Sequence, residues 1–554
     1  MSETAIGLVS PPQEITGLSN EEMNQTVLAA VYAGQKGISN LYMREFDGRF
    51  CYDHSAAMWY GFHGHAWKEE IVGEPLRAVT TIQRILNQVS KDLVFRISEI
   101  SGQIARTEEI LCDTKGLEDV DTPDIKDLKK KKKNAETQKT TIAAAQRNLD
   151  TLHYRKQIIE FAATGDKSLG ISGDEWDKDP WSLGCLNGII DLKTGILRDG
   201  KPDDYIRSIC PTVYDTKATC SKYEKFILEI CSGNKETVNF LQRFLGMGLI
   251  GDSRYKEYLL ILSGRGRNGK DTLCNVIIYV LGTALSGTIV PEMLMKNGKA
   301  MKSSGSASSD IMDLQGKRIL IASETAGGSG FDMAKVKFLS GGAPQKGRAP
   351  YGKHEIQFPS SHVLILQTND RPIADASDYA FWNRVKALEF LLSYVDSPDT
   401  KTKPYERKKN PNLAVELEKE SSGILNWLVK GCITFQKEGL NDPECVRVAT
   451  KSYKDEVDLL QIFIKSDCIE NAAAKTRAGD LYIRYKIWAI TNGLKPWSLN
   501  RFGRDMGKRY EKIPIRDGTY YIGIGLRPIM GSDDRADAVI AGTDLNPDVR
   551  EKSS

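Results

Sequence analysis

The 554-residue sequence predicts a multidomain α/β protein. Three short apolar runs, at 259–262, 318–322 and 363–368, have the length and composition of buried strands. Helical periodicity between such runs is typical of a parallel sheet covered by helices. A chain of this length is expected to hold about three or four domains.

Composition and charge exclude several classes of protein. Hydrophobic residues make up 40% and charged residues 27%, as in globular proteins, and the net charge of +3 means that a polyanion must be met by local basic patches. Ten cysteines without a CxxC pair, and six histidines without zinc-ligand spacing, favour reduced thiols. No apolar run reaches the roughly 20 residues that span a bilayer, and the N-terminus lacks a signal-peptide core. We therefore expect a soluble cytoplasmic protein without a membrane partner.

The N-terminal part divides into two predicted regions. Residues 1–90 are expected to form a β-rich module, because aromatic residues between 40 and 67 surround Asp47-Gly48, a hairpin dipeptide. Residues 91–165 are predicted to be a charged helical region containing five consecutive lysines, Lys129–Lys133. These lysines could hold a nucleic-acid backbone, but a solvated helix face is the favoured interpretation.

A third region, 166–245, precedes the apolar strand at 259–262. Its first part predicts short strands joined by tight turns at Asn187-Gly188 and Thr194-Gly195, and its second part predicts helices from about residue 220.

The segment 259–272, LLILSGRGRNGKDT, joins a strand to a helix through a glycine-rich loop. Backbone N–H groups of such a loop converge on phosphate oxygens, the helix dipole adds positive potential, and Lys270 can reach the β and γ phosphates. A chance glycine-rich turn is the alternative, against which the flanking strand and helix argue. The predicted nucleotide-contacting residues are Gly264, Arg265, Gly266, Arg267, Asn268, Gly269, Lys270, Asp271 and Thr272. One position departs from GxxxxGK(S/T), because Asp271 follows the lysine and Thr272 comes next.

Three more positions could complete a hydrolase, which needs a carboxylate to orient water and a cation to stabilise the transition state. Glu324 follows the strand 318–322 at the sheet edge where α/β proteins place functional groups, so it is predicted to activate water. Its alternative is a solvent-facing acid or a neighbour of a helix cap. Asn369 follows the strand 363–368 and could hold a phosphate or a water, although Asn-Asp-Arg-Pro also fits a simple turn. Arg384, before a strand at 385–390, is the candidate arginine finger.

These segments together resemble the superfamily 3 helicases, the AAA+ branch found in small viruses, phages and plasmids, and most closely the helicase half of poxvirus-type primase-helicases. The motifs are LSGRGRNGKDT, DLQGKRILIASET, KFLSGG with PYGKHEIQFPS, LILQTN and FWNRV, in the family's order and spacing. The similarity covers about residues 170–530 and, more weakly, 41–67. It implies an AAA+ P-loop ATPase domain at 246–396, preceded at 166–245 by a module specific to the family.

The resemblance also implies roles for single residues. Lys270 would bind phosphate, Glu324 would be the Walker B acid, Asn369 sensor 1, and Arg384 a finger acting on a neighbouring subunit's ATP. The cofactors would be ATP and Mg²⁺, and the chain would form a homo-oligomer, as a hexameric ring. Lys337 matches the basic residue of the family's third motif.

The sequence departs from that pattern at three places. Ala343 follows Gly341-Gly342 where the family has aspartate, Asp271 replaces a hydroxyl residue, and Ser323 rather than aspartate precedes Glu324. Our hypothesis is that Asp271 supplies the missing magnesium ligand beside Glu324, with Thr272 as the alternative ligand.

Two basic segments are predicted to contact DNA. A hairpin at about 346–354 has a basic tip, and in superfamily 3 rings such a hairpin points into the channel; an ordinary charged surface hairpin is the alternative. A helix, a basic helix and a strand at 481–488, 498–509 and 520–526 predict a C-terminal winged-helix domain at 451–530, which could instead mediate protein contacts. The expected DNA-binding residues are Lys337, Lys346, Arg348, Lys353, His354, Arg501, Arg504 and Lys508, with Arg509 beside them. Residues 397–450 are expected to be a helical linker and 531–554 a disordered tail.

The function that these features favour is an ATP-dependent DNA helicase that translocates on single-stranded DNA as a ring during replication of a phage, plasmid or virus. Its expected partners are single-stranded and forked DNA and a separate primase, polymerase or loader. An origin-melting initiator of the same fold and a non-motor DNA-binding ATPase switch are the alternatives. A built-in primase is disfavoured, because its only paired acids, Asp119 and Asp121, fit a solvated loop better.

Overall fold

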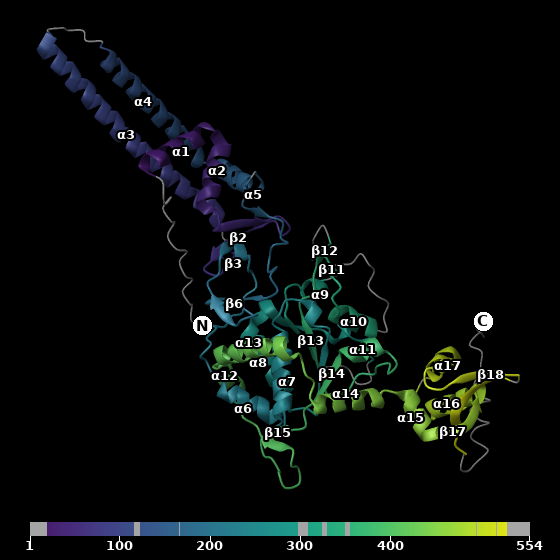
Figure 1. The fold of residues 1–554 in the computed structure, drawn as a ribbon. Helices are drawn as coiled ribbons and strands as arrows, with labels where there is room; N and C mark the ends of the chain where they lie inside the picture. Colours follow the sequence, from purple (N-terminus) through teal and green to yellow (C-terminus); the bar gives the residue numbers. More distant parts are fainter. Residues whose placement is uncertain are drawn as a thin grey trace, which may run out of the picture.

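The computed structural model describes residues 19–71, 73–115, 122–165, 167–296, 309–323, 330–348, 355–494, 496–516 and 518–528. It confirms a multidomain mixed α/β protein with a parallel sheet: a helical arm and a small sheet lead to a central sheet, and a separate C-terminal unit follows (Figure 1). Several sequence predictions fall outside the described residues, namely Glu324, Lys353, His354, the pair Asp119 and Asp121, and the tail 531–554.

The N-terminal module is more helical than expected. It begins with helices α1 (Asn20–Tyr32) and α2 (Gly34–Phe46), and only then come strands β1 (Phe50–Asp53), β2 (Met58–His63) and β3 (Ala66–Glu69), which pair in one sheet with β4 (Gly170–Ile171). The hairpin prediction at Asp47-Gly48 is wrong: the dipeptide ends α2, and the β1–β2 turn lies at 54–57. The reason is periodicity, since the buried residues Ile38, Leu41, Tyr42 and Phe46 recur at helical spacing.

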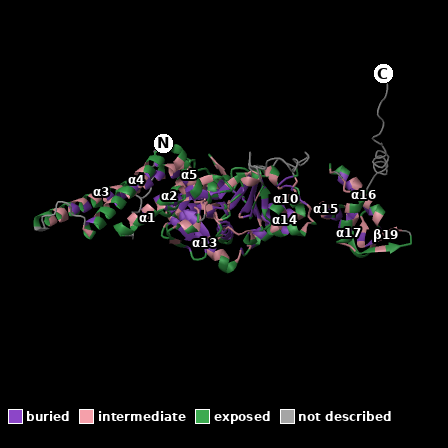
Figure 2. Cartoon of the chain, turned by 90° about the horizontal axis from the view of Figure 1, so that it is seen from above, coloured by how far each residue is buried: buried purple, intermediate pink, exposed green. Residues whose placement is uncertain are grey.

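The arm is a long helical hairpin of α3 (Glu74–Lys115) and α4 (Pro123–Leu149), followed by α5 (Leu152–Thr164). It projects from the body, and its outward surface is largely exposed (Figures 1 and 2). Its α3 seam contains Val79, Ile82, Leu86, Val89 and Leu93, buried at intervals of three or four residues. Helix α3 crosses residue 90, where the sequence had suggested a boundary.

The lysine run lies on α4 and is partly neutralised within the arm. Lys129 Nζ lies 3.2 Å from a carboxylate oxygen of Glu108, and Lys131 Nζ lies 2.7 Å from Asp127.

A three-stranded meander follows, made of β5 (Ser182–Cys185), β6 (Gly188–Asp191) and β7 (Ile196–Arg198). Its turns lie at 186–187, one residue before the predicted Asn187-Gly188, and at 192–195, which includes the predicted Thr194-Gly195. Helices α6 (Ser221–Ile230) and α7 (Lys235–Met247) then pack into the same hydrophobic core as the central sheet, so the predicted boundary at 245/246 falls inside α7.

The stretch 397–450 is not a linker. After α12 (Leu413–Glu418), helix α13 (Ser421–Glu438) is buried along α7. The backbones touch where each helix has a glycine: a Cβ at Gly246 would lie 2.2 Å from Cys432 N, and one at Gly431 would lie 2.1 Å from Gln242 O. An amphipathic pattern predicted this helix. Its burial, however, depends on α7, which lies almost 190 residues earlier in the chain.

The central sheet is parallel, with strand order β14 (Val385–Glu389), β8 (Leu259–Ser263), β13 (Val363–Thr368), β10 (Ile319–Ser323) and β9 (Ser286–Ile289). Residues along its strands alternate between two cores, one containing Leu260 and Ile321 and the other Leu259 and Leu320. The four predicted strands are present, whereas β9 was not predicted.

Around the sheet lie α8 (Lys270–Leu285), α9 (Ser309–Met312), α10 (Met333–Ser340), α11 (Tyr379–Arg384) and the antiparallel pair β11 (Gln345–Gly347) and β12 (Ile356–Phe358). A short parallel pair, β15 (Ser393–Val395) and β16 (Glu406–Lys408), follows β14.

Helix α14 (Glu444–Glu456) leads from the body to a C-terminal unit with its own core. Its elements in chain order are α15 (Leu459–Asp467), β17 (Cys468–Arg477), α16 (Ala478–Thr491), α17 (Leu499–Gly507), β18 (Lys512–Ile515) and β19 (Gly518–Leu526). The three strands form an antiparallel sheet in the order β17-β19-β18. The predicted capping serine is confirmed, because the Ser498 side chain accepts a hydrogen bond from Arg501 N.

Within the described ranges, no helix has the length and apolar content needed to cross a membrane. All ten cysteines lie in these ranges, and none forms a disulfide.

Candidate functional site

The glycine-rich loop lies between β8 and α8, as predicted, in a backbone conformation that depends on glycine. Gly264 has φ 145° and Gly269 has φ 89°. A Cβ at Gly264 would lie 2.4 Å from Phe390 O, and one at Gly269 would lie 2.8 Å from Ile230 Cγ2. Arg267 is also left-handed, with φ 64°, and its carbonyl accepts a hydrogen bond from Tyr394 N at 2.7 Å. The loop therefore packs closely against α6, against Phe390 and against Tyr394, and glycine permits this backbone conformation.

Lys270 is buried at the first turn of α8 with neutral partners. Its Nζ donates to Gly264 O at 2.8 Å and to Asn369 Oδ1 at 3.3 Å. Burial lowers the pKa of Lys270. Among the described residues no carboxylate forms an ion pair with Lys270. A buried cation whose partners in the described chain are a carbonyl and an amide is favourably placed for an incoming anion.

Asn369 therefore lies beside Lys270, as the sequence predicts. The sheet register explains the meeting: Thr368, at the end of β13, pairs with Ser263, at the end of β8. Asn268 is also buried, and its Nδ2 has no hydrogen-bond partner among the described residues.

A second polar pair lies at the same edge. Ser323 Oγ, at the end of β10, donates to Gln367 Oε1 on β13 at 2.7 Å. The Nε2 atom of Gln367 is buried without a partner in the described chain. Sequence reasoning missed Gln367, although a glutamine inside the apolar run of β13 was an available signal. Glu324, which follows Ser323, lies outside the described residues.

A cavity of about 270 Å³ opens beside the loop. Phe226 and Tyr394 are its aromatic lining residues, and Asp271 and Thr272 line it from the first turn of α8. The remaining lining residues are Arg267, Gly269, Lys409, Asn410, Pro411, Leu413 and Ala414. An apolar concave wall with a few polar groups is typical of small-molecule sites. Except for the loop residues, the sequence did not indicate this lining, because its members come from distant segments.

Arg384 lies at the opposite end of the sheet from the loop. Val385, the next residue, pairs with Leu259 at the start of β8, whereas Glu389 pairs with Ser263 next to the loop. Five strand residues at about 3.3 Å each separate the two edges by roughly 16 Å. Arg384 Nη1 donates to Ala380 O at 2.8 Å, and Nη2 donates to Glu257 Oε2 at 3.1 Å. Arg384 is thus not placed to reach the loop of its own chain.

The basic residues around the β11–β12 pair are only partly described. Lys337, on α10, forms an ion pair with Asp378 at 2.8 Å. Lys346 is exposed on β11, and Arg348 follows that strand. The two strands pair antiparallel as the hairpin prediction requires, while its tip lies outside the described residues.

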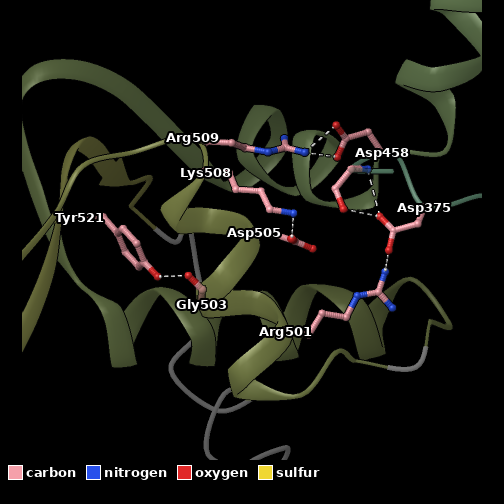
Figure 3. A network of polar contacts seen from close by, with 9 residues as sticks. Asp375, Asp458, Arg501, Gly503, Asp505, Lys508, Arg509 and Tyr521 are labelled. Carbon is pink, nitrogen blue, oxygen red and sulfur yellow. Dashed lines mark hydrogen bonds and ion pairs between the residues drawn. The ribbon is translucent and has the colours of Figure 1, made fainter. Parts of the chain in front are cut away.

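Three of the basic residues on and after α17 are paired with acids of the same chain (Figure 3). Arg501 Nη2 donates to Asp375 Oδ2 at 2.9 Å, and its guanidinium carbon lies 4.0 Å from the centre of the Trp497 ring. Lys508 pairs with Asp505 and Arg509 with Asp458. Arg504 is exposed and forms no ion pair within the described chain. The Arg501–Asp375 contact joins the C-terminal unit to the loop that follows Asn369.

Residues 39–232 match the family described as "D5 N terminal like". The match starts upstream of the module predicted at 166–245 and includes the small sheet and the arm. A single family region therefore covers most of the chain before the central sheet.

Sequence comparison finds relatives in large DNA viruses. "Putative helicase L207/L206" of Acanthamoeba polyphaga mimivirus is 24% identical over 455 residues, covering 78% of this chain and 43% of the relative. "Putative helicase 022R" of Frog virus 3 (isolate Goorha) is 22% identical over 514 residues, covering 78% and 52%. The chain thus spans about half the length of these relatives. A solved structure titled "The apo structure of NrS-1 C terminal region (305-718)" matches at 13% identity with a TM-score of 0.38, over 66% of this chain and 89% of that chain.

Proposed function

Because this chain belongs to the D5-type superfamily 3 helicase family, we propose that it is an ATP-dependent DNA helicase that translocates on single-stranded DNA as a ring during viral, phage or plasmid replication. The observation that carries the proposal is the meeting of Lys270 Nζ with Asn369 Oδ1 at the mouth of the glycine-rich loop. The names of the viral relatives support a helicase role.

The loop edge supplies the groups that phosphoryl transfer needs. The γ-phosphate of ATP would take over the contacts that Lys270 now makes with Gly264 O and Asn369 Oδ1. The nucleoside would occupy the cavity beside Phe226 and Tyr394. Glu324 would orient the attacking water, and Asn369 would report the presence of the γ-phosphate.

Asp271 and Thr272 fit a magnesium ion, since both residues line the cavity at the start of α8 and carboxylate and hydroxyl oxygens are suitable Mg²⁺ ligands. Glu324 is the third proposed ligand. A bound magnesium ion would neutralise charge on the β and γ phosphates. The Ser323 hydroxyl already donates to Gln367, so it is no substitute for a carboxylate at that edge.

The topology supports an AAA+ core and a winged-helix C-terminus. Strand β13 lies between the loop strand β8 and the strand β10 that precedes Glu324, as in AAA+ ATPases. The order helix, strand, helix, helix, strand, strand from α15 to β19 is that of a winged helix.

The position of Arg384 supports a composite site. An arginine about 16 Å from its own loop can act as a finger only on a neighbouring subunit, because the strand between them is rigid. A closed ring, proposed to be a hexamer, gives every loop such a neighbour. Lys337, Lys346, Arg348, Lys353 and His354 would contact the DNA backbone from the β11–β12 side, and Arg501, Arg504 and Lys508 from α17.

Fork unwinding tests the proposal. Wild type should unwind forks of one tail polarity, with ATP turnover stimulated by single-stranded DNA, while Lys270→Ala should lose about 100-fold or more of its turnover. Lys430→Ala, which removes an exposed lysine of α13 that belongs neither to the loop nor to the cavity lining, is the matched control. Native mass measured in parallel counts the subunits. Failure of wild type to unwind either fork would contradict the motor and leave an origin-melting initiator or an ATPase switch.

A further inference from the structure

We propose that Glu257 is a positioning residue for Arg384, so that the carboxylate of one subunit orients the arginine finger which that subunit presents to its neighbour's ATP. The inference rests on the proposed function, and it adds a residue that none of the family motifs in the sequence contains.

The sheet register brings the two side chains together. Glu257 lies two residues before β8, and Arg384 lies one residue before β14. Since Leu259 pairs with Val385, both side chains emerge at the same amino-terminal edge of the sheet. The carboxylate and the guanidinium then meet at 3.1 Å.

The guanidinium is held at two points. Ala380 O accepts from Nη1 and Glu257 Oε2 accepts from Nη2, and two acceptors on different nitrogens define the plane of the group. Its Nε atom is buried and has no partner in the described chain. The acceptor at Ala380 is a backbone carbonyl, so of these two contacts only the one with Glu257 can be removed by a side-chain substitution.

The helix that carries Arg384 is already fixed. The Asp378 side chain caps α11 by accepting from Phe381 N at 3.0 Å, and it also binds Lys337. Trp382 Nε1 donates to Asp375 O at 3.0 Å. With the backbone held in this way, the remaining freedom belongs to the arginine side chain itself.

Stability alone does not account for the pair. The Glu257 side chain is 52% exposed, and pairs with so exposed a partner contribute little to folding. A fixed orientation matters much more for a group that must meet developing charge in a transition state. Glu257 therefore acts on catalysis through Arg384 and touches no substrate.

A neighbouring ion pair offers a matched control. Lys386 lies two residues after Arg384 on β14, and its ammonium group binds Asp442. Asp442→Asn removes the acidic partner of Lys386, a residue of the same strand β14, and leaves the contacts of Arg384 in place.

The first experiment compares ATP turnover of Glu257→Ala, Glu257→Gln and Asp442→Asn. We expect Glu257→Ala to lower kcat roughly 10-fold or more with KM unchanged, since misplacement of a catalytic group by about 1 Å can cost up to 100-fold. Glu257→Gln, which keeps an oxygen acceptor, should lose less, and Asp442→Asn should match wild type. An unchanged kcat for Glu257→Ala would overturn the proposal, as would an equal loss in Asp442→Asn.

The second experiment mixes subunits. In a ring of Glu257→Ala and Lys270→Ala chains, some sites combine an intact loop from the first chain with an intact finger from the second. The mixture should turn over ATP faster than either variant alone, and a mixture of Arg384→Ala with Lys270→Ala should do the same.

The two mixtures separate the possible failures. If only the Arg384 mixture recovers, Glu257 affects the ATP site of its own subunit and not the finger presented to the neighbour; the inference is then wrong while the composite site stands. If neither recovers, the finger in trans is itself wrong, and the inference fails with it.

Discussion

At the scale of single residues, the candidate site depends on a few side chains at the ends of parallel strands. The sequence predicted Lys270 and Asn369 because each follows a local pattern, a loop and a strand end, and the structure brings them to 3.3 Å. Gln367 and Tyr394 were missed because their roles come only from contacts with other strands. A local sequence pattern thus indicates the chemistry of a residue, but it does not identify the distant residues that the folded chain brings into contact with it.

The residue after the loop lysine gives the first prediction at this scale. Asp271→Ser should raise the Mg²⁺ concentration for half-maximal ATP turnover about 10-fold, since a carboxylate ligand is replaced by a neutral one. Titration of turnover with Mg²⁺ at saturating ATP measures it, with Thr272→Val as the comparison. Unchanged or tighter Mg²⁺ dependence in Asp271→Ser would show that this carboxylate is no ligand.

His362 gives a prediction on stability. It is buried, with its Nε2 3.0 Å from Leu339 O and its Nδ1 unpaired in the described chain. Burial, and then the charge of Lys256, lower the pKa of His362 from 6.5 to about 4. The folded protein therefore keeps this imidazole neutral where the unfolded chain protonates it, so its contribution to stability is present above about pH 6.5 and falls as the pH drops towards 4.

Between pH 7 and 5 the loss should be about 2 kcal/mol of unfolding free energy. Urea unfolding of wild type and of His362→Gln measures this loss, because glutamine does not titrate between pH 7 and 5. The difference in unfolding free energy between the two proteins should change by about 2 kcal/mol over that range. A difference that is constant with pH would contradict a buried neutral histidine.

At the scale of elements, the C-terminal unit is joined to the body that contains the central sheet by polar contacts. Its core is its own, and Arg501 on α17 reaches Asp375 in the loop after β13. Helix α17 and its cap were predictable because capping and amphipathicity are local. Asp375, the acid that pairs with Arg501, was not predictable, since it lies 126 residues earlier in the chain.

The ion pair with Asp375 competes with any phosphate for Arg501. Asp375→Asn should therefore bind DNA up to about fivefold more tightly, since partly exposed ion pairs contribute about 1 kcal/mol or less. Fluorescence anisotropy with labelled single-stranded DNA at two salt concentrations measures the effect. Asp480→Asn, which removes an exposed acid of α16, controls for the change in net charge. Equal gains in both variants would mean that α17 has no specific part in DNA binding.

At the scale of the whole molecule, the loop lies at the carboxyl edge of the central sheet and Arg384 at its amino edge. Under the proposed function, a complete site would therefore need two copies of the chain. ATP turnover per chain should therefore fall on dilution in step with the loss of oligomer seen by mass photometry. Constant turnover per chain in a sample that is monomeric would rule out the composite site.

The sequence by itself determined the loop, its lysine, four strands of the central sheet and the order of the C-terminal helices, because these follow from local backbone chemistry and from hydrophobic period. The tertiary structure decided that α13 belongs to the core and that Glu257 contacts Arg384. Both depend on register or burial against segments far along the chain, where no local pattern names the partner.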